Sequence, residues 1–161
     1  MASNSIARYH KYMPIKMKPA DQTLRLENQL CFALYSTSLA MTKMYKPMLD
    51  AIRLTYPQYL VMLVLWEEDG LMVSEIGERL FLDSGTLTPL LKRLEATGRL
   101  ARLRDTEDER RVRVKLTAAG NRLRVKAAEI PSCIRDITGC SLSELLSLSQ
   151  NIKRFRQRLM G

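Results

Sequence analysis

The spacing of apolar residues between positions 73 and 116 limits the possible folds of this chain more than any other feature. Apolar residues recur at helical spacing over 73–80 and again over 87–94, with good capping residues in the turn between the two segments. The spacing then changes to alternation over 99–104 and 112–116, as in a β-hairpin. Two helices joined by a tight turn and followed directly by a hairpin form a winged helix-turn-helix. The sequence therefore predicts a mainly α-helical fold with a small β-hairpin.

Helical spacing also continues on both sides of this winged unit. The expected helices run from Leu24 to about Pro47 with Asp21 or Thr23 as the cap, from 58 to 68, from Thr117 or Asn121 past Pro131 with a kink, and from a capping box at Ser141. The terminal helices exceed what a minimal winged helix needs, and we assign them to a dimer interface. The expected organisation is a basic, flexible arm over 1–22 and one domain over 23–161, with the winged helix-turn-helix at about 56–116 and the dimerisation helices at about 24–55 and 117–160.

The charge balance favours a polyanionic partner. Lys and Arg number 26 against 17 Asp and Glu, a formal net charge of +9, and such a surplus attracts nucleic acid or an acidic membrane surface. Charge alone is also typical of an ordinary solvated surface. The longest apolar run, 59–66, is far shorter than the roughly 20 residues of a membrane helix, and the N-terminus has no apolar segment of a secretory signal. We therefore expect a cytoplasmic protein with no membrane partner and three free cysteines.

The second helix of the helix-turn-helix carries residues suited to DNA. It starts near Ser84, and its outward residues are Ser84, Thr86, Thr88, Lys92 and Arg93. Small hydroxyl side chains let the start of the helix approach base edges and exchange hydrogen bonds with them, while the two cations and the helix N-terminus suit phosphates. Pro89 is placed early in the helix, where its missing amide costs least. We therefore predict that this helix binds double-stranded DNA.

The predicted hairpin is strongly basic and suits the same partner. Arginines at a wing tip enter a minor groove and read its width. Asp108 lies two residues before Arg110, a spacing at which a carboxylate holds the guanidinium in place. One monomer presents one recognition helix, so strong specificity requires a dimer whose half-sites lie about 34–36 Å apart on one DNA face. The sequence thus favours a homodimer that binds paired half-sites.

Four runs of the sequence resemble one known group of regulators. They are LENQLCFALY at 26–35, LTYPQYL at 54–60, LDSGTLTPLLK at 82–92 and DER at 108–110. Together they are similar to the organic hydroperoxide resistance regulators, the peroxide-sensing members of the MarR (multiple antibiotic resistance regulator) family, over about residues 24 to 160. The resemblance implies a dimeric repressor whose reactive cysteine is oxidised by organic hydroperoxides. The oxidised repressor then leaves its palindromic operator and frees a gene for a thiol peroxidase.

The resemblance also implies roles for particular residues. Cys31 falls on the reactive position, and Tyr45 and Tyr56 fall on the two tyrosines whose hydroxyls bond that cysteine. Cys31 and Tyr45 are 14 residues apart on one expected helix, which is about 21 Å along the axis and too far for contact. If Tyr45 serves Cys31, it must therefore come from the other subunit. Tyr35, at i+4, can reach Cys31 locally.

The identity of the resolving cysteine, which would form a disulfide with oxidised Cys31, is open between two candidates. The family has one-cysteine and two-cysteine branches, and in the second a cysteine late in the partner's fifth helix condenses with the oxidised one. Cys133 and Cys140 lie about one helical turn to either side of that place. We favour Cys133, because the helix after Pro131 gives it a fixed direction. Cys140 is the alternative, a small thiol can cap Cys31 instead, and either cysteine is equally typical of a buried apolar residue.

Three other functions are compatible with the sequence. One is a thiol peroxidase in which Cys31 attacks the peroxide and Cys133 resolves. Other enzyme classes are disfavoured, because the only histidine is His10 and no glycine-rich phosphate loop is present; we therefore expect no enzyme, metal or cofactor. The remaining two are a MarR-type repressor released by a small aromatic ligand and a protein-interaction module that binds no DNA.

Overall fold

The computed structural model describes residues 22–104 and 111–160 and divides into two compact units, residues 1–41 and 42–161. The first unit contains a short 3-10 helix, η1 (Leu26–Asn28), and the first part of α2 (Leu30–Ala51). The helix expected from Leu24 to Pro47 was therefore wrong at both ends, since α2 starts at Leu30 and continues through Pro47. Gln29 is extended, and its side-chain Nε2 donates to the Arg25 carbonyl at 3.2 Å. Such local bonds compete with the helix, so Thr23 does not cap α2, and Asp21 lies outside the described residues.

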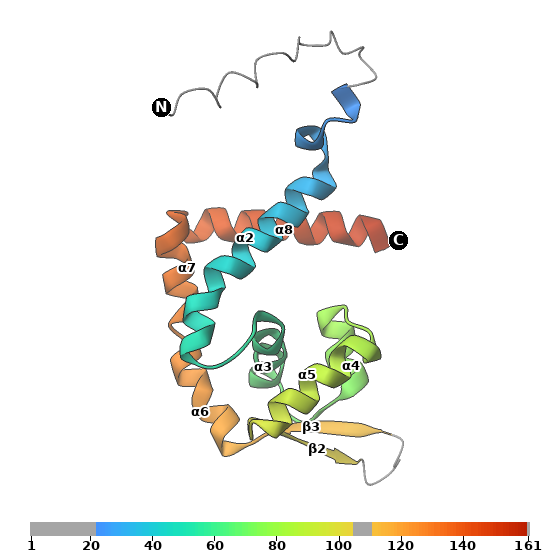
Figure 1. Ribbon diagram of the computed structural model, residues 1–161, viewed down its shortest axis with the longest axis vertical. Helices are drawn as coiled ribbons and strands as arrows, with labels where there is room; N and C mark the ends of the chain where they lie inside the picture. The colour runs from blue at the N-terminus through green and yellow to red at the C-terminus, as the bar shows by residue number, and fades with distance from the viewer. Residues whose placement is uncertain (1–21, 105–110, 161) are drawn as a thin grey trace, which may run out of the picture. The chain divides into compact units, whose positions relative to one another are not determined.

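Residues 42–161 contain the winged helix-turn-helix that the sequence predicts (Figure 1). After the end of α2, its elements are α3 (Tyr56–Glu67), β1 (Leu71–Met72), α4 (Val73–Leu80), α5 (Ser84–Ala96), β2 (Leu100–Arg104) and β3 (Val112–Leu116). The antiparallel sheet has the order β1-β3-β2, with Leu100 opposite Leu116 and Leu71 opposite Val114. The mainly α-helical fold with a hairpin is confirmed. Strand β1 was not expected, because two residues are too few to show a periodic pattern.

Helix α3 is the centre of the hydrophobic core, as its nearly uniform apolar surface predicts. Val61, Met62 and Leu65 are at most 1% exposed, and α3 packs against α4, α5 and α6. From α5, Leu87 and Leu91 enter the same core and are each 1% exposed. Burying a leucine side chain contributes about 1.5–3 kcal/mol. These contacts hold one face of α5 on the core and leave the opposite face to solvent.

Backbone contacts fix the turn between α4 and α5. Phe81 ends α4 in the left-handed conformation at φ 56°, and Leu82 donates its N–H to the Gly77 carbonyl at 2.9 Å. A Cβ on Gly77 would lie 2.9 Å from the Leu82 carbonyl oxygen, so only glycine permits this close approach. Asp83 then caps α5 by accepting the Thr86 N–H at 2.8 Å. The turn thereby sets the direction of α5.

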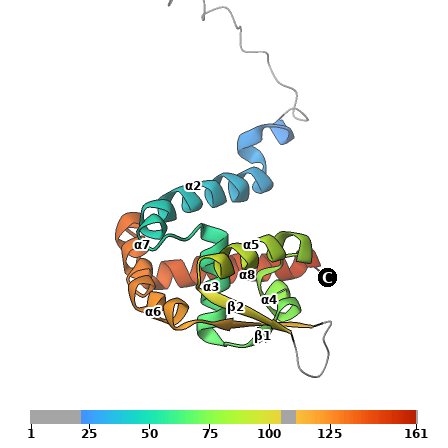
Figure 2. The same ribbon diagram turned by 60° about the horizontal axis from the view of Figure 1, so that its bottom comes forward.

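The C-terminal third forms three helices (Figure 2), which are α6 (Ala118–Ala127), α7 (Ile130–Thr138) and α8 (Leu142–Met160). The expectation of one kinked helix running past Pro131 was wrong. Helix α6 ends at Ala127, and Pro131 lies in the first turn of a separate helix, α7. Proline has no N–H for the preceding turn but fits the start of a new helix. Thr117 caps α6 by accepting the Gly120 N–H at 3.0 Å. The capping box of Ser141 and Glu144 is confirmed by bonds of 2.7 and 3.3 Å between each backbone N–H and the other's side chain.

Many apolar side chains of the terminal helices stay exposed. Helix α8 has 19 residues, and none of them is buried. The large exposed apolar residues of α8 include Leu142, Leu146, Leu148, Ile152 and Leu159, and those of α2 include Leu30, Phe32, Leu34 and Leu39. Within residues 22–104 and 111–160, no helix combines the length and apolar character needed to cross a bilayer.

Candidate nucleic-acid interface and tyrosine cluster

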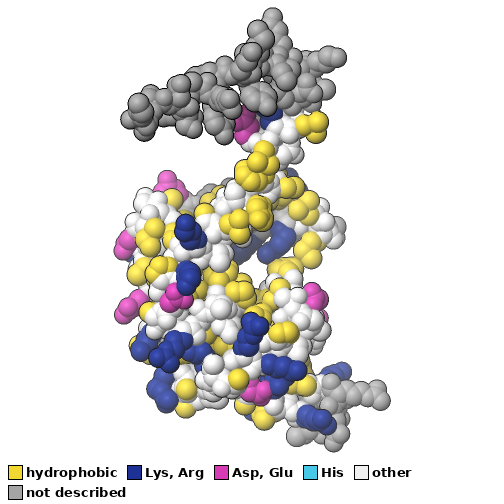
Figure 3. Space-filling view, viewed as in Figure 1, with side chains coloured by type: hydrophobic (Ala, Val, Ile, Leu, Met, Phe, Trp, Pro, Cys, Tyr) yellow, Lys and Arg dark blue, Asp and Glu magenta, His cyan; other side chains and the backbone are white. Residues whose placement is uncertain are grey.

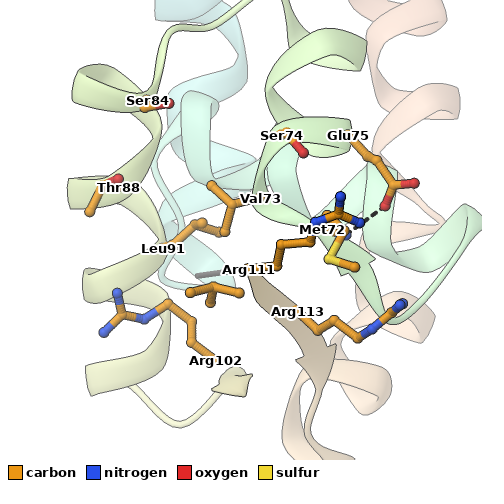
Figure 4. Close-up of a pocket in the computed structure, with 11 residues that line it drawn as sticks. Met72, Val73, Ser74, Glu75, Ser84, Thr88, Leu91, Arg102, Arg111 and Arg113 are labelled. Atoms are coloured by element: carbon orange, nitrogen blue, oxygen red, sulfur yellow. Dashed lines mark hydrogen bonds between the residues drawn. The ribbon is translucent and has the colours of Figure 1, made fainter. Parts of the chain in front are cut away.

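An open cavity of about 810 Å³ lies between α5 and the hairpin. Ser84 and Thr88 line it from α5, and Arg102 lines it from β2 (Figure 4). Arg113 lines it from β3, and Arg111 lines it from just before that strand. Within residues 42–161, Lys and Arg side chains gather around the hairpin and the helix that follows it (Figure 3). Small hydroxyl residues on one wall and guanidinium groups on the other are suited to a polyanion with polar edges.

Two carboxylates near the cavity have local partners. Glu75 on α4 accepts the Met72 N–H at 2.6 Å. Glu95 on α5 accepts the backbone N–H of Arg102 at 2.9 Å and its Nε at 2.8 Å, and these bonds lower the pKa of the Glu95 carboxyl. The Glu95–Arg102 pair ties α5 to β2, the first strand of the hairpin. The sequence reasoning missed this pair, because its two residues lie on different elements and no local period connects them.

The predicted DNA-binding residues of α5 lie at its surface. Ser84, Thr86, Pro89, Lys92 and Arg93 are exposed, and Thr88 is half-buried beside the cavity. Thr86 also has a partner, since its hydroxyl donates to the Asp83 carboxylate at 3.1 Å. The expectation that Pro89 costs least was wrong: it is the sixth residue of α5, beyond the four amides that lack helical partners at an N-terminus. Asp108 and Arg110 lie outside the described residues.

A cluster of tyrosines lies where α2 meets α3. The ring centroids of Tyr45 and Tyr56 are 5.0 Å apart, and those of Tyr45 and Tyr59 are 6.1 Å apart. Burial, and for Tyr45 also the neighbouring Tyr56, raises the pKa of both Tyr45 and Tyr56 above the usual value. Burial raises the pKa of Tyr59 to about 12. All three phenols are therefore protonated near neutral pH and can donate hydrogen bonds to an anion.

The candidate cysteines occupy three different settings. Cys31 is exposed in the first turn of α2, and Tyr35 is exposed one turn later. Cys133 is half-buried on α7, while Cys140 is half-buried between α7 and α8, with its thiol 3.6 Å from the Thr138 carbonyl oxygen. The structure thus brings Tyr45 and Tyr56 together within the second unit, whereas Cys31 and Tyr35 belong to the first.

The tyrosine cluster predicts a loss of stability at high pH. An unfolded tyrosine titrates near pH 10, whereas Tyr59 in the folded protein has a pKa of about 12. The neutral phenol therefore stabilises the fold fully below pH 10, and this stability is lost as the pH rises towards 12. Circular dichroism and tyrosinate absorbance, followed together against pH, should show Tyr59→Phe unfolding at higher pH than the parent. If Tyr59 instead ionises near pH 10 while the protein is still folded, the assignment is contradicted.

The second unit matches a known family of regulators. Residues 43–127 match the family described as transcriptional regulator SarA/Rot. Over 125 residues the chain is 52% identical to the organic hydroperoxide resistance transcriptional regulator of Bacillus subtilis (strain 168), covering 78% of this chain and 85% of that protein. The chain belongs to the MarR family, in the group of the organic hydroperoxide resistance regulators.

Two further relatives match the chain over a larger share of its length. The HTH-type transcriptional regulator TtmR of Methylorubrum extorquens (strain PA1) is 51% identical over 139 residues, covering 86% of this chain and 71% of TtmR. Reduced AbfR bound to DNA, a protein of Staphylococcus epidermidis, superposes with a TM-score of 0.68 and 34% identity, covering 88% of this chain and 99% of AbfR. AbfR has also been solved with a disulfide formed, which superposes with a TM-score of 0.56 and 36% identity over 84% of this chain and 96% of AbfR. As a MarR-family member, the chain is a transcriptional regulator with a winged-helix fold.

Proposed function

We propose that this protein is a dimeric, DNA-binding repressor that leaves its operator when an organic hydroperoxide oxidises Cys31. The contact between Tyr45 and Tyr56 carries the proposal, because it sets two protonated phenols side by side on α2 and on α3, the central helix of the winged unit. Phenol hydrogen bonds favour a thiolate over a thiol, and the thiolate is the form that reacts with peroxides. Membership of the hydroperoxide-resistance group supports the same assignment. Such a repressor acts in the cytoplasm, where reducing thiols are present.

The DNA-binding part of the proposal uses the exposed side of α5 and the wing. The start of α5 enters a major groove, so that Ser84 and Thr88 reach base edges while Lys92 and Arg93 reach phosphates. The guanidinium groups beside the cavity add phosphate contacts from β2 and β3. The relative AbfR, solved in complex with DNA, supports DNA as the partner.

The dimer part of the proposal uses the exposed apolar faces of α2 and α8. A helix of 19 residues with no buried side chain is stable only when another surface covers its apolar face. A second copy of the chain supplies that surface and places two recognition helices on a palindromic operator. In such a dimer the thiol of Cys31 meets Tyr45 and Tyr56 of the partner subunit, because Cys31 and Tyr45 are separated by about 21 Å along α2.

The proposed chemistry is a two-electron oxidation of sulfur. The Cys31 thiolate attacks the outer oxygen of the hydroperoxide, the O–O bond breaks, and the alkoxide leaves and takes a proton to become an alcohol. Cys31 becomes a sulfenic acid. A second thiol, from Cys133 or Cys140 of the partner or from a small molecule, then attacks the sulfur, forms a disulfide and releases water. The bond or the added oxygen displaces the phenols, which tilts the winged units and spoils the half-site spacing.

The DNA contact predicts a change in salt dependence for one lysine. Lys92 is exposed on α5, and each phosphate contact contributes about −0.9 to the slope of log K against log salt. Lys92→Ala should therefore weaken binding to all sequences alike and reduce the magnitude of the slope by about 1 per subunit. Fluorescence anisotropy over a salt series measures this slope. Lys126→Ala, at an exposed position on α6, is the matched control, and an equal change in both variants would contradict the proposed interface.

A further inference from the structure

The turn between α2 and α3 connects the two tyrosines of the cluster. Tyr45 lies on α2 before the turn, and Tyr56 is the first residue of α3 after it. The Leu49 carbonyl accepts the N–H of Ile52 at 3.1 Å and of Leu54 at 3.0 Å, so the turn is closed by its own backbone. The Ile52 and Leu54 side chains are 6% and 4% exposed. Because the turn is closed and its side chains are buried, we expect a displacement of the tyrosines to move the whole turn and the groups bonded to it.

The side chain of Arg99 connects this turn to the recognition helix. Its Nη2 donates to the Ile52 carbonyl at 3.0 Å, and its Nη1 donates to the Thr97 hydroxyl at 3.1 Å. Thr97 is the C-cap of α5, and its hydroxyl lies 3.1 Å from the Arg93 carbonyl and 3.0 Å from the Leu94 carbonyl. One guanidinium thus binds the turn at one end of its fork and the last turn of α5 at the other.

The backbone of Arg99 is fixed as firmly as its side chain. Its N–H donates to the Leu94 carbonyl at 3.0 Å, and its carbonyl accepts the Thr117 N–H at 3.1 Å. A Cβ on Gly120 would overlap the Arg99 carbonyl oxygen, so α6 lies directly against this peptide. Arg99 therefore cannot shift alone, and a movement of Ile52 reaches the end of α5 through a short, rigid connection.

Only a guanidinium fits both acceptors at once. Arg99 is half-buried, and burial, followed by the nearby charge of Arg53, lowers its pKa. The two groups that accept its hydrogen bonds, a carbonyl and a hydroxyl, are neutral. A lysine ammonium is a compact charge that does not reproduce the planar fork of donors, and a glutamine is shorter and uncharged. Conservative substitutions at Arg99 should therefore break one or both bonds.

We propose that Arg99 is the positioning residue that couples the tyrosine pair to the recognition helix. Its bonds to the Ile52 carbonyl and to the Thr97 cap transmit a displacement of Tyr45 and Tyr56 to α5. The inference rests on the proposed function, because it assumes that oxidation of Cys31 displaces those tyrosines. It assigns to Arg99 a role in operator release and none in the oxidation itself.

The test separates oxidation from its effect on DNA binding. Operator affinity is measured by fluorescence anisotropy for reduced protein and for protein oxidised with an organic hydroperoxide, with the oxidation state of Cys31 verified by mass spectrometry. In Arg99→Lys and Arg99→Gln, the ratio of reduced to oxidised affinity should fall by about 3- to 30-fold, while the rate of Cys31 oxidation stays at the parent value. Thr97→Val, which removes one acceptor and keeps the side-chain shape, should give a smaller decrease.

The controls keep the outcomes distinct. Arg79→Gln removes another guanidinium link between elements, the ion pair of Arg79 with Glu68, and should leave the affinity ratio unchanged. A parent protein that is oxidised at Cys31 yet keeps its operator would overturn the proposed function. A parent that releases its operator, together with Arg99 variants of unchanged ratio, would overturn this inference alone. If Arg99→Gln does not fold, Arg99→Lys and Thr97→Val decide.

Discussion

Cys31→Ser is expected to bind the operator as tightly as the parent protein and to keep it bound in the presence of organic hydroperoxides. A serine hydroxyl is isosteric with the thiol but does not form the reactive anion near neutral pH, so no sulfenic acid forms. Cys31 is exposed at the start of α2, far along the chain from α5, so the substitution leaves the DNA-binding surface intact. Fluorescence anisotropy with tert-butyl hydroperoxide should therefore change from complete release to no measurable release.

Cys133→Ser and Cys140→Ser are the matched controls for this result. Both residues are half-buried free thiols, Cys133 on α7 and Cys140 between α7 and α8. On non-reducing electrophoresis of peroxide-treated protein, a covalent dimer band should require Cys31 and only one of these two. We expect the band to disappear with Cys133→Ser. Operator release that survives in Cys31→Ser and disappears in either control would refute the assignment of the reactive cysteine.

Cys31→Ser and an assay of peroxide consumption separate the alternative functions. A repressor released by a small aromatic ligand would respond to that ligand equally in the parent and in Cys31→Ser. A thiol peroxidase would consume many equivalents of hydroperoxide per protein when a reductant is supplied, whereas a sensor reacts about once for each release. Consumption of peroxide measured beside anisotropy therefore distinguishes a sensor from an enzyme.

Gly120→Ala is expected to lower the free energy of unfolding by about 3 kcal/mol, near the upper end of the usual cost of overpacking. The added Cβ would overlap the Arg99 carbonyl oxygen and lie 3.2 Å from Leu116 Cδ2. Because the nearest atoms belong to backbone, no side-chain rotation relieves the overlap. The Gly120 carbonyl also accepts the Trp66 Nε1–H at 3.1 Å, so a shift of α6 would break a buried bond. Urea unfolding followed by circular dichroism measures the change.

Gly98→Ala is the matched comparison for Gly120→Ala. Gly98 has φ +68°, and a Cβ there would meet nothing within 4 Å. Its replacement should cost about 1–2 kcal/mol from the left-handed conformation alone. The two glycines lie at opposite ends of the same junction between α5, the hairpin and α6. Because Gly120 is helical and has no positive φ, a loss at position 120 no larger than that at position 98 would show that α6 relieves the overlap with the Arg99 carbonyl at little cost, and would contradict the prediction.

Much of the winged domain could be predicted from local sequence. Strands β2 and β3 and helices α4 and α5 follow from the change of apolar period, because side-chain burial repeats with the geometry of each element. The capping box at Ser141 was equally readable, since a cap depends on residues at most three apart. The sequence left the start of α6 open between Thr117 and Asn121, and the structure selects Thr117. The start of α2 was not readable from the sequence, because side-chain bonds of Asn28 and Gln29 to preceding carbonyls compete with the helix there.

The sequence by itself determined the order of α4, α5, β2 and β3, the polar and basic character of α5 and the hairpin, and the family to which the chain belongs. These properties depend on neighbours along the chain or on residue identity. Only the tertiary structure decided the pairing of Glu95 with Arg102, the approach of Tyr45 to Tyr56 and the bond from Arg99 to Ile52. Arg99 and Ile52 are 47 residues apart, and such contacts form because packing on α3 brings separate segments together, which no local period encodes.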